Sequence, residues 1–271
     1  MDLPVPVSGF ADVDGGRLYY ETAGTGRPLV LLHAGIADSR MWDAQMAAFA
    51  PHYQVIRYDQ RGYGLSSVPG SPYAPARDLQ QLLHYLGAGQ ALLVGLSGGG
   101  LLALDFTLEY PEMVAAMVLT APGLSGFQWS SALEAQSRQL AAALERGDVP
   151  AAVDLWLALW VEGPAAPASR ADPAVRDRMR ELLTDRFSRP PGQGEPRLLE
   201  PPAIGRLAAV ACPTLIVAGD QDVPDILRIT ELLQAQIPGA RRVVLPNVAH
   251  MVNLERPAEF NALVLDFFQG R

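Results

Sequence analysis

The sequence predicts an α/β fold with a doubly wound, mostly parallel β-sheet. Short runs rich in Val, Leu and Ile alternate with longer helical patterns along most of the chain. These apolar runs are continuous, which is typical of strands buried on both faces of a parallel sheet. The chain of 271 residues, 49% hydrophobic and 18% charged, is long enough to bury a sizeable core.

Seven segments are predicted to be strands, and the first follows the turn Asp14-Gly15-Gly16. These strands are residues 17–22, 29–32, 53–58, 91–95, 113–120, 214–218 and 242–245. Helical patterns lie between them, near residues 40–50, 75–86, 98–109, 225–236 and 257–269.

One region breaks this alternation. From Ala121 to about Arg206 there are only helical patterns, interrupted by Pro and Gly. The first helix follows the spacing of Leu133, Gln136, Leu140 and Leu144, the second covers residues 150–161, and the third begins with Asp172 as N-cap before Pro173. We expect residues 121–206 to form a helical cap between two parts of one core domain, residues 1–120 and 207–271.

Composition excludes several classes of partner. The net charge of −8 argues against nucleic acid, which needs clustered basic residues. The single cysteine, Cys212, rules out an intramolecular disulfide, fits a reducing compartment and is expected to be a small buried hydrophobe. The stretch Met1–Gly16 is unlike a signal peptide, and no apolar run reaches the roughly 20 residues of a membrane span. We therefore expect a cytoplasmic protein with no membrane partner.

The most specific motif surrounds Ser97. An apolar strand runs into Gly95-Leu96-Ser97-Gly98-Gly99, and an apolar helix follows. A sharp strand-to-helix turn of this Gly-x-Ser-x-Gly type lifts the hydroxyl above the sheet as a nucleophile. The alternative, a phosphate-binding turn, lacks its G-x-x-x-x-G-K-[ST] pattern, and the chain contains no Lys.

A serine nucleophile needs a base, and the chain has four histidines. His52 lies in a polar turn, His84 on the exposed side of a helix, and His33 at the end of a buried strand, where it is expected to order the turn. His250 follows the last strand, where open α/β sheets place ligand-facing groups, and is the predicted base.

The carboxylate that orients this base is expected in the loop after strand 214–218. Three residues are candidates, Asp220, Asp222 and Asp225. Asp225 is well placed to N-cap the next helix. Spacing alone does not separate Asp220 from Asp222. No histidine pair has metal-ligand spacing, so neither a metal nor another cofactor is expected.

These motifs resemble the α/β-hydrolase superfamily over nearly the whole chain, particularly its esterase, enol-lactonase and cofactor-free haloperoxidase branches. The resemblance rests on residues 32–35, 59–66, 95–99 and the pair 219–222 with His250. It implies an α/β-hydrolase fold with a helical cap after the sixth strand, and it selects Asp222 as the third member of a catalytic triad. It also implies structural roles for Asp59 and Arg61, and for Trp42 a role in packing the helix after the oxyanion loop.

An oxyanion needs two backbone N–H donors. One is expected from Gly98, directly after the nucleophile. The resemblance assigns the other to Gly35, although Ala34 replaces the family's usual Gly and leaves Gly35 and Ile36 both open.

The predicted function is hydrolysis of a largely apolar ester or lactone through an acyl-enzyme on Ser97. C–C bond hydrolysis or perhydrolysis by the same triad is an alternative, and a slow-turnover ligand receptor is an alternative of another class. Trp129, Trp156 and Trp160 either pack the cap on the sheet or line a substrate pocket. Ile36 and Met251 are further candidate substrate contacts, and a homo-oligomer is compatible with the sequence.

Overall fold

A computed structural model of the chain describes residues 6–167, 170–189 and 192–269, which contain one eight-stranded sheet. The strands are β1 (Val7–Val13), β2 (Gly16–Ala23), β3 (Pro28–Leu32), β4 (Gln54–Tyr58), β5 (Ala91–Leu96), β6 (Val114–Thr120), β7 (Thr214–Gly219) and β8 (Arg241–Leu245). Their order is β1-β2-β4-β3-β5-β6-β7-β8. The pairs β1·β2 and β2·β4 are antiparallel and all others parallel, so the predicted mostly parallel sheet is confirmed.

Strand β1 was not expected from the sequence. It pairs with β2 along its whole length through the turn at Asp14 and Gly15. Ala11 is its only fully buried residue, because β1 lies at the edge of the sheet. An edge strand of this kind has no continuous apolar run, so its hydrophobic pattern is weak. Residues 1–5 of the N-terminal stretch considered above lie outside the described residues.

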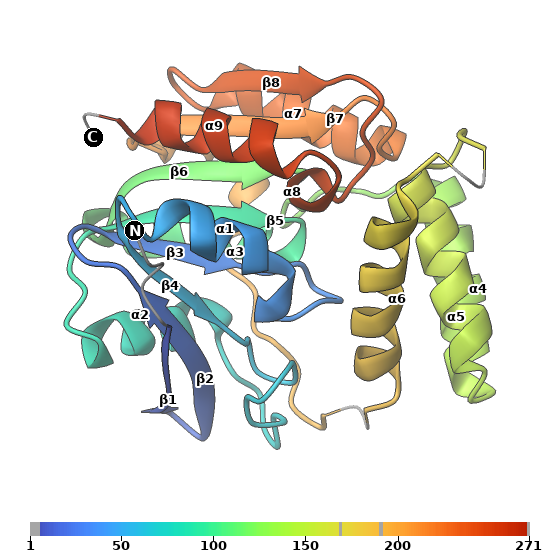
Figure 1. Ribbon diagram of the computed structural model, residues 1–271, viewed down its shortest axis with the longest axis horizontal. Coiled ribbons are helices and arrows are strands. Elements are labelled where there is room, and N and C mark those ends of the chain that lie inside the picture. The colour runs from blue at the N-terminus through green and yellow to red at the C-terminus, as the bar shows by residue number, and fades with distance from the viewer. Residues whose placement is uncertain (1–5, 168–169, 190–191, 270–271) are drawn as a thin grey trace.

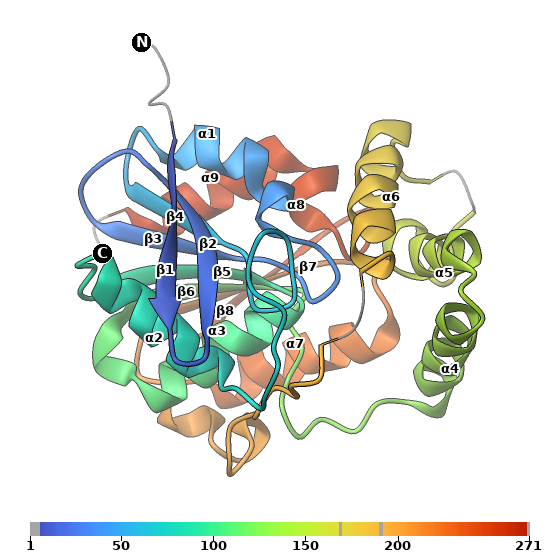
Figure 2. The same cartoon turned by 90° about the horizontal axis from the view of Figure 1, so that it is seen from below.

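Helices cover both faces of the sheet (Figures 1 and 2). One face carries α1 (Asp43–Phe49), α8 (Val252–Glu255) and α9 (Pro257–Phe268), and the other carries α2 (Pro75–Tyr85), α3 (Gly98–Glu109) and α7 (Pro224–Gln236). Each layer encloses its own apolar core. Trp42 is fully buried at the start of α1 and stacks on Phe260 of α9, with ring centroids 6.2 Å apart.

Between β6 and β7 the chain forms three longer helices beyond the carboxyl ends of the strands (Figure 1). They are α4 (Ser131–Glu145), α5 (Val149–Trp156) and α6 (Pro173–Phe187). Helix α5 continues as a π-helical turn, η3 (Leu157–Glu162), within the stretch predicted as one regular helix. Asp172 caps α6 as expected, since its carboxylate accepts the Ala174 N–H at 2.8 Å. We refer to residues 121–206 as the inserted segment.

Polar contacts join the inserted segment to the core. The Asp225 carboxylate accepts both the N–H (3.2 Å) and the hydroxyl (2.5 Å) of Ser130, the residue that caps α4. The prediction that Asp225 caps its own helix is wrong. The N-cap of α7 is Val223, two residues earlier, so Asp225 lies in the first turn of the helix, where its carboxylate holds the start of α4.

Within the described part of the chain, no helix has the length and apolar character needed to cross a membrane. The same residues contain no group of three or more His, Cys, Asp or Glu side chains arranged to hold a metal ion.

Candidate active site

Ser97 lies in a strained turn between β5 and α3. Its φ is 55° and its ψ −114°, a conformation that side-chain-bearing residues rarely adopt. Two glycines make the turn possible. A Cβ atom added to Gly95 would lie 2.3 Å from the Gly99 oxygen, and one added to Gly99 would lie 2.0 Å from the Leu32 oxygen. The Ser97 N–H is held by the Thr120 oxygen at 2.9 Å. The surrounding backbone therefore fixes the backbone of Ser97, whose side chain lines the main cavity described below.

Strain is concentrated at this edge of the sheet. Among the described residues, three that are not glycine have a positive φ, namely Ser97, Ala121 and Asn247. Ser97 directly follows β5, Ala121 directly follows β6, and Asn247 lies two residues after β8. Strained residues gather where the surrounding structure holds them in place, often at functional sites. Their distribution places the candidate functional site at the carboxyl ends of the strands.

His250 and Asp222 form a buried pair. The His250 Nδ1 atom lies 2.8 Å from the Asp222 Oδ2 atom, and both side chains are almost fully buried. The second Asp222 oxygen accepts the Val223 N–H at 2.7 Å. Asp220 has a different role, because its Oδ1 accepts the Asn247 N–H at 2.7 Å and closes the turn after β8. The geometry thus separates the two aspartates that spacing alone did not.

The other histidines lie outside this arrangement. The His33 Nε2 atom accepts the Gln60 N–H at 2.9 Å, and Nδ1 lies 2.8 Å from the Ala34 oxygen. This network requires neutral imidazole with its proton on Nδ1. Burial lowers the pKa of His33, in agreement with the neutral form. His52 and His84 are exposed.

Gly35 and Gly98 meet in space beside Ser97. A Cβ atom on Gly98 would lie 3.0 Å from the Gly35 nitrogen, so the two backbones approach closely. Ala34 is fully buried and is not among the positive-φ residues, which explains why alanine is tolerated there. The Tyr63 hydroxyl donates to the Gly35 oxygen at 2.5 Å. This contact of Tyr63 was missed from the sequence, where only Asp59 and Arg61 of residues 59–66 were given structural roles.

Residues 59–66 are held by buried hydrogen bonds and one buried ion pair. Asp59 accepts the N–H groups of Ser39 at 2.9 Å and Leu65 at 2.7 Å. The guanidinium of Arg61 makes a two-point ion pair with Asp78, at 2.6 and 2.7 Å. Asp59 and Arg61 therefore hold the loop that carries Tyr63.

A cavity of about 680 Å³ opens between these loops and the inserted segment. We call it the main cavity. Its wall includes Ser97, His250, Gly35 and Gly98 together with the predicted substrate contacts Ile36, Trp129, Trp156 and Trp160. Met251 was also predicted to contact substrate, but it does not line the cavity. Its side chain is fully buried in the hydrophobic core that includes residues of α1 and α9.

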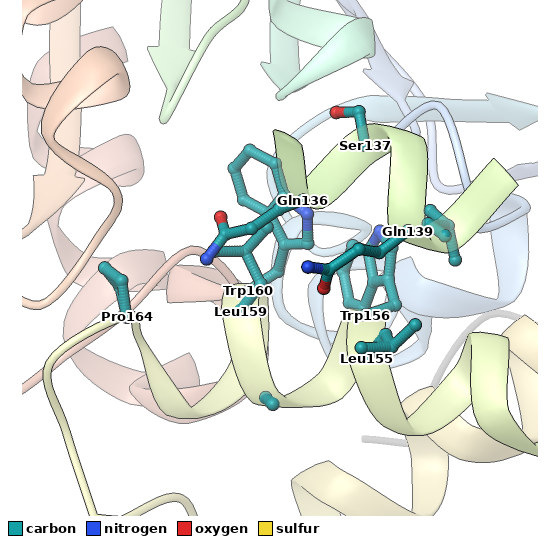
Figure 3. A pocket seen from close by; sticks show the side chains of 10 residues that line it. Gln136, Ser137, Gln139, Leu155, Trp156, Leu159, Trp160 and Pro164 are labelled. Carbon is teal, nitrogen blue, oxygen red and sulfur yellow. The ribbon is translucent and has the colours of Figure 1, made fainter. Parts of the chain in front are cut away.

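Two tryptophans connect the inserted segment with His250. The Trp160 and His250 rings lie 4.4 Å apart between centroids, and the Trp160 oxygen accepts the His250 N–H at 3.2 Å. Trp156 stacks on Trp160 at 6.1 Å. Figure 3 shows both indoles directed from α5 and η3 toward α4, where Gln136 and Gln139 border an outer hollow of about 200 Å³. The π-helical turn places Trp160 in contact with His250 through both its ring and its backbone; such turns are frequent at functional sites.

Comparisons with known proteins agree with this geometry. A family model described as the alpha/beta hydrolase fold matches residues 27–257. A candidate carbamate hydrolase of Klebsiella pneumoniae (strain 342) is 32% identical, covering 89% of this chain and 91% of the relative. A pimeloyl-[acyl-carrier protein] methyl ester esterase of Nitrosospira multiformis is 28% identical, covering 92% and 97%.

A solved structure is similar as well. It is described as Est816, an N-acyl homoserine lactone degrading enzyme, and aligns with a TM-score of 0.77 at 28% identity, covering 96% of this chain and all of the other. The sheet order, the Ser97 turn and the extent of the family match lead to one conclusion: this chain belongs to the α/β-hydrolase family of enzymes.

Proposed function

We propose that the protein is a serine hydrolase that cleaves a carboxylic ester or lactone through an acyl-enzyme on Ser97. The observation that carries the proposal is one constellation: Ser97 and His250 share the wall of the main cavity, and His250 is paired with Asp222 behind it. Hydrolysis of esters and lactones by the relatives named above supports the same reaction class.

In the proposed reaction, the Ser97 hydroxyl attacks the substrate carbonyl carbon while His250 accepts its proton. Asp222 accepts the Nδ1–H of His250, which leaves Nε2 as the basic nitrogen and stabilises the imidazolium. The N–H groups of Gly35 and Gly98 hold the developing oxyanion. His250 then returns the proton to the leaving oxygen, and a water molecule, activated by the same base, releases the acid and restores Ser97.

The inserted segment serves as the cap in this proposal, and residues 1–120 and 207–271 as the core domain that carries the reacting groups. The apolar part of the main cavity wall, with Ile36, Trp129, Trp156 and Trp160, favours a largely apolar group near the scissile bond.

The first test is labelling with a fluorophosphonate probe, followed by a screen of p-nitrophenyl esters and lactones. We expect one adduct, on Ser97, and measurable turnover of at least one ester or lactone. Ser97→Ala should lose the adduct and lower kcat by at least about 10³-fold, while the thermal unfolding midpoint changes little. An adduct elsewhere, or unchanged ester cleavage by Ser97→Ala, would contradict the assignment.

A further inference from the structure

A second hollow begins at the predicted oxyanion residues and follows α3 away from Ser97. It has a volume of about 340 Å³ and shares Gly35, Gly98 and Leu101 with the main cavity. Its floor continues along α3 through Asp105 to Glu109. Since an α-helix rises 1.5 Å per residue, the path from Gly98 to Glu109 is about 16 Å long. We call this hollow the α3 groove.

The walls of the α3 groove are fixed by hydrogen bonds. On one side, the Tyr73 backbone accepts the Arg197 N–H at 2.7 Å and donates to the Glu195 oxygen at 3.2 Å, which holds the segment 195–200 in place. At the floor, the Ser125 hydroxyl donates to Asp105 at 2.9 Å and accepts the Ala203 N–H at 2.9 Å. Hydrogen bonds between segments that are distant in the sequence therefore fix the shape of the groove.

The position of His250 assigns one side of the substrate to each hollow. His250 lines the main cavity and is not part of the α3 groove. The base must return its proton to the leaving oxygen, so the leaving group has to lie on the side of His250. Gly35 and Gly98, where the carbonyl oxygen would be held, line both hollows, so the acyl carbon on Ser97 would lie near the place where the hollows join, and the α3 groove is the one that His250 does not line. We propose that the α3 groove binds the acyl chain and the main cavity binds the leaving group, an inference that rests on the proposed serine hydrolase function.

The side chains along the groove specify the chemistry of this acyl chain. Tyr63 and Tyr73 border it, and its lining residues include three carboxylates, those of Asp105, Glu109 and Glu200, and one guanidinium, that of Arg197. The guanidiniums of Arg61 and Arg186 lie behind this lining, over the rings of Tyr73 and Tyr63. A surplus of negative charge disfavours a carboxylate at the far end of the chain. The preferred acyl chain is extended and carries hydroxyl or amide groups along its length.

Esters that share the same leaving group and differ only in their acyl chain test the acyl assignment alone. We would compare p-nitrophenyl esters of acetate, of a long ω-hydroxyalkanoate and of the ω-carboxyalkanoate of equal length. Leu198 is 54% exposed on the groove wall, so Leu198→Trp narrows the groove with little risk to the fold. The matched control is Leu155→Trp, at an apolar position 38% exposed on α5 outside the groove. Thermal unfolding of each variant checks its stability.

We expect Leu198→Trp to lower kcat/KM for the long ω-hydroxyacyl ester about tenfold and to leave the acetate ester within about twofold. Leu155→Trp should change neither. The acyl group stays on Ser97 after p-nitrophenol has left, so the deacylation rate in burst kinetics should fall as well. Equal loss with both esters, or no loss with the long ester, would overturn the acyl assignment.

A crossed experiment tests the main cavity. Ser137 is exposed on α4 and lines that cavity, so Ser137→Trp should lower kcat/KM selectively for acetate esters of bulky alcohols. The reverse pattern, in which Leu198→Trp discriminates among alcohols and Ser137→Trp among acids, would overturn the proposal. Failure of the serine hydrolase function itself is distinct, since it predicts no acetate cleavage and no probe adduct in the unaltered protein.

A double variant tests whether the α3 groove disfavours a carboxylate at the end of the acyl chain. Replacing both Glu109 and Glu200 by Gln removes two of the three carboxylates of the groove. We expect the kcat/KM ratio of the ω-carboxyacyl ester to the ω-hydroxyacyl ester to rise about fivefold at low salt and less at high salt. An unchanged ratio would overturn the assignment of acyl charge.

Discussion

The loops of the sheet and the inserted segment contribute to the site in different ways. Ser97, Asp222 and His250 come from the ends of strands in one sheet, and buried backbone hydrogen bonds and strained turns fix them. The inserted segment meets the same site through aromatic rings and through polar contacts such as Ser130 with Asp225. The difference indicates that the core fixes the three side chains of the proposed triad, while the inserted segment covers His250 and lines the main cavity.

The largest expected effect comes from the core. Asp222→Asn keeps the size of the side chain but removes the carboxylate that fixes the His250 tautomer, so kcat should fall by about 10⁴-fold. The matched control is Asp220→Asn, in the same loop, whose remaining oxygen can still accept the Asn247 N–H. That control should change kcat by less than about threefold. Comparable losses in both variants would show that the loop, and not the Asp222 carboxylate, is what matters.

The next largest effect concerns the contacts of Arg170, which connect the inserted segment to the core. Arg170 donates to the oxygens of Val161 (2.5 Å) and Asn247 (2.9 Å) and pairs at 2.6 Å with Glu255, which is almost fully buried. Arg170→Met removes the ion-pair partner of this carboxylate, which keeps its hydrogen bond from the Ala249 N–H, so we expect a loss of about 3–5 kcal/mol in the free energy of unfolding.

Urea denaturation measures this loss. The control is Arg180→Met, which breaks an exposed pair with Asp154 and should cost less than about 1 kcal/mol. Equal losses for the two variants would mean that the join through Arg170 contributes no more than a surface ion pair.

A smaller effect is expected at the contact between Trp160 and His250. Trp160→Leu removes the ring that covers the imidazole while keeping the backbone bond to the His250 N–H. An aromatic face beside an imidazolium is worth about 0.5–2 kcal/mol, so kcat should fall about tenfold, with a smaller change in KM for a short ester. Trp156→Leu, one step further from His250, is the control and should alter kcat less. If only KM changes in Trp160→Leu, the ring serves substrate binding alone.

Much of the core could be predicted from the sequence because its signals are local. The strand before Ser97 and the helix after it follow from continuous apolar runs, and the α3 boundaries agree with the predicted 98–109. The choice of Asp222 over Asp220 required the family resemblance, because two carboxylates in one loop differ only in the direction in which their side chains point. That direction depends on where Asn247 and His250 arrive from a distant part of the chain.

The inserted segment was less predictable. Its helices follow from spacing, but the π-helical turn that brings Trp160 to His250 depends on tertiary contacts. Met251 has the apolar character expected of a pocket residue, and only the path of the loop shows that it points into the core. Tyr63 gave no signal, because its hydrogen bond joins two loops that are far apart in the sequence.

An effect of similar size to that at Trp160 depends on pH and on the two ends of the inserted segment. Asp105 of α3 lies where these ends return to the core, since it accepts the Ser125 hydroxyl, which in turn holds the Ala203 N–H. Burial raises the pKa of Asp105 to about 6, so the folded protein binds this proton more tightly than the unfolded chain does. The contribution of Asp105 to stability therefore increases as the pH falls from about 6 toward 4 and is lost as the pH rises through 6.

Asp105→Asn removes this titration. When the pH falls from 7 to 4.5, we expect the unaltered protein to gain about 1–2 kcal/mol more in its free energy of unfolding than the variant does. Urea denaturation at the two pH values measures this difference, and Asp12→Asn, at an exposed position on β1, is the control. Parallel pH dependences of the Asp105 variant and the unaltered protein would show that this carboxylate does not link proton binding to the attachment of the inserted segment. A difference restricted to Asp105→Asn would place a pH-sensitive contact at the base of that segment, where Ser125 and Ala203 meet α3.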